Sequence, residues 1–211
     1  MNAATKLVRV MEAHGVTATE RQTDLLAVYC RQLWDWNARL NLTRHTDFET
    51  FVTHDLHDSR QIADLLNPNA RILDVGSGGG VPGIPIAILR PDVSVALSES
   101  TQKKATALQL IVEALSLDIP VYPERGEAVI RQQSFDTLTA RAVAPLKKLI
   151  PLFRPCRRRF RRLLLIKGPG WHAERQEADS AGLLKGVTIR VAAEYATVGR
   201  DGKSVILEVM V

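Results

Sequence analysis

The chain has 211 residues, of which 45% are hydrophobic, a length and composition that suit one folded domain with a sizeable apolar core. Its two cysteines, Cys30 and Cys156, lie far apart and in no Cys-x-x-Cys pair, which argues against a zinc ribbon or a disulfide scaffold. The net charge is only +5, and the sequence contains no run of about 18 apolar residues and no signal-like N-terminus, so we expect a cytoplasmic protein without a membrane span.

The first third of the chain has helical periodicity. Apolar stripes near residues 7–11 and 25–36 predict two helices, the second beginning after Thr19. A third helical stretch, residues 47–66, ends at the turn signal Asn67-Pro68-Asn69. We interpret residues 1–66 as a helical extension packed on a core domain of residues 67–211, the two forming one compact unit.

From residue 70 onward, short apolar runs alternate with helical patterns. We expect helices over residues 82–89 and 101–115 and a short one near Glu127. We expect strands at residues 71–75, 93–98, 119–122, 135–140 and 163–166, followed by a closing hairpin of residues 187–193 and 204–211. This order predicts an α/β protein with a Rossmann-like, mostly parallel doubly wound sheet, a C-terminal antiparallel hairpin and an N-terminal helical cap.

A glycine-rich turn follows the first predicted strand, and its glycines are Gly76, Gly78, Gly79, Gly80 and Gly83. Glycine permits a tight strand-to-helix turn and leaves bare backbone for a ligand, while the helix start offers free N–H groups to a negative group. The spacing also fits the dinucleotide pattern, so a nicotinamide oxidoreductase stays open. Asp74, however, suits the ammonium group of S-adenosylmethionine, and a dinucleotide fold usually begins with its glycine strand. These two features favour a methyltransferase.

The second predicted strand ends in an acidic residue, Glu99. An acidic residue about 20 positions after the glycine turn is expected to bind the ribose hydroxyls of a nucleotide cofactor. A surface glutamate is the alternative, and it explains less because both the position and the residue type fit a cofactor site.

Several further motifs accompany the turn: Asn41-Leu-Thr43, His54 with Asp58-Ser59, Glu99-Ser100 with Lys103, Arg125-Gly-Glu127, Phe135-Asp136 with Ala140-Arg-Ala142, and Leu165-Ile-Lys-Gly168. With them, the chain resembles the bacterial small-subunit ribosomal RNA guanine-N7 methyltransferases, the RsmG or GidB (glucose-inhibited division protein B) family, over nearly its full length. The resemblance implies an enzyme that uses S-adenosyl-L-methionine to methylate N7 of a guanine in small-subunit (16S) ribosomal RNA. Its partner would be that RNA or the ribosomal particle.

The resemblance also implies cofactor contacts. It places Gly76 and Val81 against the cofactor in the turn, and Gly126 and Glu127 beside its adenine. With the residues argued above, the predicted cofactor site consists of Asp74, Gly76, Gly78, Val81, Glu99, Gly126, Glu127 and Arg141. The family usually has valine or alanine where this chain has Gly126, so we expect a less bulky pocket wall.

The resemblance places Arg141 in the active-site pocket and Lys167 facing the RNA or the site. These two are therefore the predicted catalytic residues, and their role would be to position the substrate. Guanine N7 carries a lone pair and no proton, so it needs no general base to attack a methyl group. A cation that hydrogen-bonds guanine O6 would orient the ring. For Arg141 the alternative is an ion pair at a strand end.

The resemblance implies that Lys103 and Arg125 face the RNA, and Arg158, from the arginine-rich stretch, is the third predicted RNA contact. Six arginines lie in one short stretch, at positions 154, 157, 158, 159, 161 and 162. A local positive patch suits a polyanion, but a solvated turn before a strand fits the pattern equally well.

The remaining candidates have less specific patterns. His54, Asp55, His57 and Asp58 share a helix face, but no second segment supplies ligands and the reaction needs no metal, so we predict no metal site. Trp34 and Trp36 are expected to pack within the helices in preference to stacking on bases, and Trp171 is undecided. A small-molecule methyltransferase and a non-catalytic RNA-binding protein remain as alternatives. We expect a monomer.

Overall fold

The structure is a computed structural model that describes residues 2–199 and 202–211, so residue 1 of the expected extension lies outside the described residues. Within this part of the chain, seven strands form one sheet in the order β3-β2-β1-β4-β5-β7-β6. The strands are β1 (Arg71–Val75), β2 (Ser94–Ser98), β3 (Val121–Tyr122), β4 (Thr137–Arg141), β5 (Arg162–Lys167), β6 (Thr188–Ala196) and β7 (Lys203–Met210). The first five strands pair in parallel, and β7 lies antiparallel to both β5 and β6. This arrangement confirms the predicted fold class.

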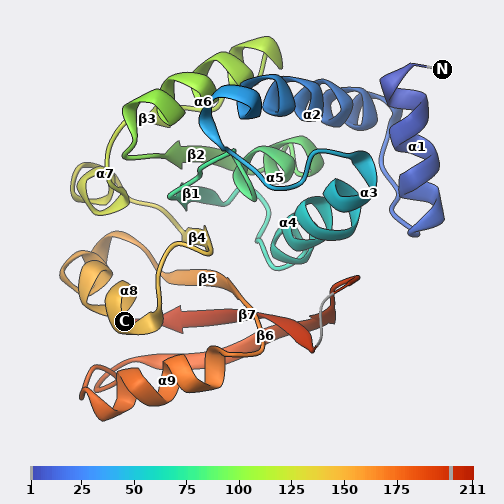
Figure 1. Cartoon of the computed structure of the whole chain (residues 1–211). Helices are drawn as coiled ribbons and strands as arrows, with labels where there is room; N and C mark the ends of the chain where they lie inside the picture. The colour runs from blue at the N-terminus through green and yellow to red at the C-terminus, as the bar shows by residue number, and fades with distance from the viewer. Residues whose placement is uncertain (1, 200–201) are drawn as a thin grey trace.

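The helices follow the predicted order with some differences (Figure 1). They are α1 (Ala3–Ala13), α2 (Glu20–Leu40), α3 (Phe48–Thr50), α4 (His57–Ala63), α5 (Gly83–Leu89), α6 (Gln102–Ala114), α7 (Gly126–Gln132), α8 (Leu146–Phe153) and α9 (Trp171–Ser180). The predicted start of α2 after Thr19 is confirmed, because the Thr19 hydroxyl accepts from the Gln22 amide and the Gln22 side chain accepts from the Thr19 amide.

Some predicted elements were wrong in detail. The stretch 47–66 is not one regular α-helix, because η1 (Phe51–Leu56) is a π-helical turn between α3 and α4. The third strand covers two residues instead of four. Helices α8 and α9 were not predicted. Helix α8 begins after Pro145 and contains Pro151, a residue that usually interrupts a helix, and α9 is mostly polar, so it has no clear helical apolar stripe.

Two apolar clusters cover the two faces of the sheet. Alternate strand residues point to opposite faces, so Ile72 and Leu164 belong to one cluster while Leu73 and Leu163 belong to the other. Helices α1, α2 and α4 contribute to the same cluster as α5 and α6, and Figure 1 shows α2 running beside α6. The N-terminal helices therefore pack directly on the face of the sheet that also carries α5 and α6. Trp34 and Trp36 pack against this cluster, as expected.

The order of strands reverses beside β1, which lies between β2 and β4. In open α/β sheets, ligands bind outside the carboxyl ends of the strands at such a switch point. The glycine turn follows β1, Glu99 follows β2, Arg141 ends β4 and Lys167 ends β5. The fold thus places these predicted site residues at one edge of the sheet.

Candidate active site

The glycine turn has the left-handed backbone that the sequence predicted. Gly76, Gly78 and Gly80 have φ angles of +66°, +56° and +95°, which glycine adopts without the penalty a Cβ would bring. The amides of Gly76 and Ser77 both donate to the Ser98 carbonyl, at 2.9 and 3.0 Å. These two bonds tie the turn to the end of β2.

The glycines of this turn serve different purposes. A Cβ at Gly83 would lie 2.4 Å from Leu97 Cδ2, so Gly83 allows α5 to pack against β2. A Cβ at Gly78 would meet only the Gly76 carbonyl oxygen, at 3.9 Å. Open space therefore lies above Gly78, where a ligand can approach bare backbone, and this cradle fits the amino-acid end of S-adenosylmethionine.

The N-terminal helices hold the turn from below. The hydroxyl of Tyr29, which is fully buried in α2, donates to the Gly79 carbonyl at 2.8 Å. A Cβ at Gly79 would lie 3.0 Å from both Leu33 Cδ1 and the Leu42 carbonyl oxygen. Burial raises the pKa of Tyr29 well above its ordinary value, so its hydroxyl stays protonated and available as a donor.

Asp74 lies beneath the turn and is almost fully buried. Its Oδ1 accepts from the Thr139 hydroxyl at 3.0 Å and its Oδ2 from the Gly83 amide at 3.3 Å. Burial raises the pKa of Asp74 to about 6. Asp74 therefore anchors the first residue of α5, and its predicted contact with a cofactor ammonium group stays a prediction.

Glu99 lies next to the turn at the end of β2. Its Oε2 accepts from the Gly78 amide at 3.0 Å, and its Oε1 accepts from the Thr101 amide at 2.7 Å. The carboxylate thus connects the turn to the start of α6. Its predicted contact with ribose hydroxyls is compatible with this position and remains a prediction.

Gly126 and Glu127 begin α7 at the same edge of the sheet. A Cβ at Gly126 would lie 2.7 Å from Val75 Cγ1. Val75 therefore occupies the space that a side chain at position 126 would take, and the expected less bulky pocket wall stays a prediction. Lys103 and Arg125 are exposed near the starts of α6 and α7, on this same side of the molecule.

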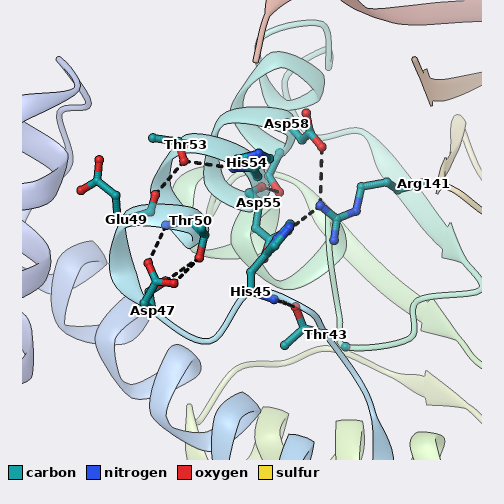
Figure 2. Close-up of polar contacts among 12 residues, drawn as sticks. Thr43, His45, Asp47, Glu49, Thr50, Thr53, His54, Asp55, Asp58 and Arg141 are labelled. Carbon is teal, nitrogen blue, oxygen red and sulfur yellow. Dashed lines mark hydrogen bonds and ion pairs between the residues drawn. The ribbon is translucent and has the colours of Figure 1, made fainter. Parts of the chain in front are cut away.

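Arg141 reaches from the end of β4 to the helical segment η1–α4, as Figure 2 shows. Its Nη1 lies 2.5 Å from Asp55 Oδ1 and 3.5 Å from Asp58 Oδ2. His45 Nδ1 lies 2.9 Å from Asp55 Oδ1, and the Tyr195 hydroxyl donates to Asp58 Oδ1 at 2.8 Å. Arg141 thus forms the ion pair at a strand end that was the alternative interpretation, and it does so within the candidate site.

The charges of this cluster stabilise one another despite burial. Burial alone would raise the pKa of Asp55, but the hydrogen bond from His45 and the charge of Arg141 outweigh it and hold that pKa below its ordinary value. Burial alone would lower the pKa of Arg141, but Asp55 and Asp58 raise it above its ordinary value. Two carboxylates, those of Asp55 and Asp58, thus face one guanidinium in this cluster.

The sequence missed His45 and Tyr195 as partners of this cluster. It gave Asp55 no role except as a candidate metal ligand, and Asp58 none except that and its place in the Asp58-Ser59 motif. The available signal was spacing: Asp55 and Asp58 follow Phe51 by four and seven residues, which puts them on the apolar face of a helix, and buried carboxylates need partners. Among residues 2–199 and 202–211, the histidine, cysteine and acidic side chains form no group of three or more that could hold a metal ion.

A cavity of about 880 Å³ opens beside Arg141. It is lined by Asn41, Leu42, Thr43, Arg44, His45, Asp58, Arg141, Ala142, Ile166, Lys167, Gly168 and Glu174. Lys167 Nζ donates to the Ala144 carbonyl at 2.8 Å and to Glu174 Oε2 at 2.7 Å, which fixes the loop after β4. The structure brings Arg141 and Lys167 together in this wall, whereas Arg158 lies elsewhere, in η2 (Arg154–Arg159) before the start of β5.

The fold has solved counterparts. A mutant of MtNAS in complex with S-adenosylmethionine is similar with a TM-score of 0.59 at 20% identity, over 90% of this chain and 79% of that chain. M. capricolum TrmK in complex with S-adenosyl-homocysteine has a TM-score of 0.54 at 15% identity, over 72% of this chain and 67% of that chain. The sheet and the glycine turn at its switch point thus define a protein with the fold of S-adenosylmethionine-dependent methyltransferases.

Sequence comparison gives the family. The GidB model, described as rRNA small subunit methyltransferase G, matches residues 22–197. A relative named Ribosomal RNA small subunit methyltransferase G in Rhodopirellula baltica is 47% identical over 185 residues, 88% of this chain and 80% of the relative. The relative of that name in Solibacter usitatus is 33% identical over 195 residues, 92% and 90% of the two chains. The chain belongs to this family.

Family and fold together confirm the resemblance seen in the sequence and the expected methyltransferase that uses S-adenosyl-L-methionine. Family membership also argues against the nicotinamide oxidoreductase that the glycine spacing had left open. Within the described ranges, the helices are too short or too polar to cross a membrane.

Proposed function

We propose that this chain transfers the methyl group of S-adenosylmethionine to N7 of a guanine in small-subunit ribosomal RNA, as a monomer in the bacterial cytoplasm. One observation carries the proposal, namely the cavity at the carboxyl ends of β4 and β5, with the fixed guanidinium of Arg141 in its wall. Guanine presents two hydrogen-bond acceptors, N7 and O6, on the same edge of its ring. A single fixed donor that takes O6 leaves N7 free to react.

Methylation of guanine N7 requires the protein to position the reactants and does not require a general base. When bound, S-adenosylmethionine supplies an electrophilic methyl group on a sulfonium sulfur. The N7 lone pair forms the new N–C bond as the C–S bond breaks, and the positive charge passes from sulfur to the purine. No proton moves, so alignment is the main contribution of the protein, and alignment can lower a barrier by about 7–11 kcal/mol.

Arg141 is the residue placed to orient the base. Its Nη1 is occupied by Asp55 and Asp58, while among the described residues its other nitrogens have no hydrogen-bond partner. These nitrogens can donate to guanine O6. The negative charges of Asp55 and Asp58 beside the guanidinium reduce its repulsion of the positive charge that the purine acquires.

Lys167 supports the same cavity in a different way. Its ammonium group has three donors, of which two hold Ala144 and Glu174. The third is available to a phosphate next to the target nucleotide. A base inside a duplex cannot enter such a cavity, so the target guanine lies in a loop or is turned out of its helix.

The test is methyl transfer from labelled S-adenosylmethionine to small-subunit RNA and particles from cells that lack the protein, followed by cleavage at 7-methylguanine to map the base. We expect label at one guanine. Arg141→Ala should lower the rate at saturating S-adenosylmethionine by about 100-fold, and the exposed Arg21→Ala should match wild type. Label at another atom, label on small molecules alone, or full activity of Arg141→Ala contradicts the proposal.

A further inference from the structure

Four exposed arginines, Arg157, Arg158, Arg159 and Arg161, lie between α8 and β5 and are here called the arginine face. The two other arginines of this stretch have structural partners. Arg154 donates to the carbonyls of Leu183 and Lys185, at 2.6 and 3.1 Å, and Arg162 pairs with Glu208 and with the Leu65 carbonyl. The stretch therefore separates into two arginines that hold the fold and four that face solvent.

The arginine face lies at the opposite edge of the sheet from the cavity. The Arg159 carbonyl accepts from the Phe135 amide at 2.8 Å, just before β4 begins, and the Arg161 amide donates to the Asp136 carbonyl at 3.2 Å. These are the amino ends of β4 and β5, whereas Arg141 and Lys167 stand at their carboxyl ends. Strands of five and six residues, at about 3.3 Å each, separate the two by roughly 15–20 Å.

Little negative charge balances this face. Asp136 lies 3.5 Å from Arg161, and Glu208 is buried and engaged by Arg162 and Arg190. Among the described residues, Arg158 and Arg159 have no carboxylate partner. Exposed Arg71 adds positive charge here, because its carbonyl accepts from the Asp136 amide. Adjacent positive charges repel one another and do not stabilise the fold, so this arrangement favours the binding of a polyanionic ligand.

We propose that the arginine face binds phosphates of a second segment of small-subunit RNA while the cavity at the opposite edge takes the target guanine. This proposal rests on the proposed function. Arginine binds phosphate bidentately, and RNA is already the substrate polymer. A short piece of RNA centred on the cavity does not extend around the sheet. The arginine face therefore recognises the fold of the RNA, and it favours extended RNA over a fragment.

The experiment compares an Arg157→Gln/Arg158→Gln/Arg159→Gln variant with a control of equal charge, Lys6→Gln/Arg9→Gln/Arg21→Gln, whose residues are exposed on α1 and α2. Each is assayed on three substrates: the small-subunit particle, protein-free small-subunit RNA, and a short hairpin that contains the target guanine. KM, kcat and the salt dependence of binding are measured for each.

For the arginine-face variant we expect KM to rise at least tenfold on the particle and on protein-free RNA, with kcat unchanged. The slope of log affinity against log salt should fall by about 2–3, as for three lost phosphate contacts, while the hairpin and the control variant show no change. Unchanged KM and slope on the long RNAs overturn the proposal, as does an equal loss on the hairpin or in the control. A loss on the particle alone points to a ribosomal protein and also overturns it. If wild type methylates none of the three, the proposed function itself has failed.

Discussion

Arg141 and Asp55 stand 86 residues apart in the chain, yet Nη1 of the arginine lies 2.5 Å from Oδ1 of the aspartate. The contact joins the end of β4 to the π-helical turn η1. Asp55 is fully buried, so its charge has little access to water. The N-terminal helices therefore set the position of the residue that we assign to the substrate.

Removal of Asp55 leaves Arg141 with Asp58 alone, at 3.5 Å. We expect Asp55→Ala to lower the free energy of unfolding by about 3–5 kcal/mol, since one partner of a buried ion pair is then uncompensated. Urea unfolding measures this value. Glu49→Ala is the control, because Glu49 pairs with His14 on the surface nearby and should cost less than about 1 kcal/mol. Equal losses for the two variants would show that the buried pair does not hold the segment.

Tyr29 tests whether the N-terminal helices support the cofactor turn. Tyr29→Phe leaves the Gly79 carbonyl without its donor, so the turn is less well ordered before the cofactor binds. We expect the dissociation constant for S-adenosylmethionine, measured by calorimetry, to rise roughly fivefold, which corresponds to about 1 kcal/mol. Tyr195→Phe loses a hydroxyl that contacts Asp58 and should leave this constant unchanged. The idea fails if both variants bind the cofactor like wild type.

Local patterns made most of the sheet predictable from the sequence. Buried parallel strands are short apolar runs, and β1, β2 and β5 each stood out for this reason, whereas β4 contains two threonines and an arginine. The glycine turn was equally visible, because its backbone needs residues without a Cβ. The start of α2 follows from Thr19 and Gln22, which are three residues apart.

The remaining features depend on contacts between residues far apart in the sequence, so local patterns could not predict them. His45 and Tyr195 belong to the Arg141 cluster only because a loop and a late strand meet there, and neither is marked by its own neighbours in the chain. The arginine stretch shows the same limit. Its composition indicated a positive patch, but only the strand register shows that the patch lies at the edge opposite the cavity.

Gly78 and Gly15 share a left-handed backbone, so a comparison of alanine variants at the two positions distinguishes an effect on cofactor binding from an effect on stability. Gly78 and Gly15 have φ angles of +56° and +65°, and no side chain would obstruct a Cβ at either position. Alanine at either position should cost about 1–2 kcal/mol of stability. We expect only Gly78→Ala to weaken S-adenosylmethionine binding, by tenfold or more, because the new methyl group enters the space above the turn. Calorimetry and thermal unfolding of both variants check this, and equal cofactor affinities would contradict it.

Asp74 gives a pH dependence with a defined sign. Burial raises the pKa of Asp74 from 3.8 to about 6 in the folded protein, so the folded state binds more protons than the unfolded state between these values. Its contribution to stability is present in full only below pH 3.8 and is lost as the pH rises through 6, by up to about 3 kcal/mol in total. Asp74→Asn cannot titrate. The difference in free energy of unfolding between wild type and this variant should therefore fall by most of that amount between pH 4 and pH 7.

The pH dependence of cofactor binding tests the predicted contact between Asp74 and the ammonium group of S-adenosylmethionine. An ammonium group beside Asp74 favours the charged carboxylate, so binding of S-adenosylmethionine below pH 6 must first release a proton. We expect the affinity of wild type to fall by up to about tenfold for each pH unit below 6, and that of Asp74→Asn to stay flat across the same range. Calorimetry in two buffers of different ionisation enthalpy counts the released proton. If wild type binds the cofactor equally well at pH 5 and pH 7 and releases no proton, Asp74 only anchors α5 and another group receives the ammonium.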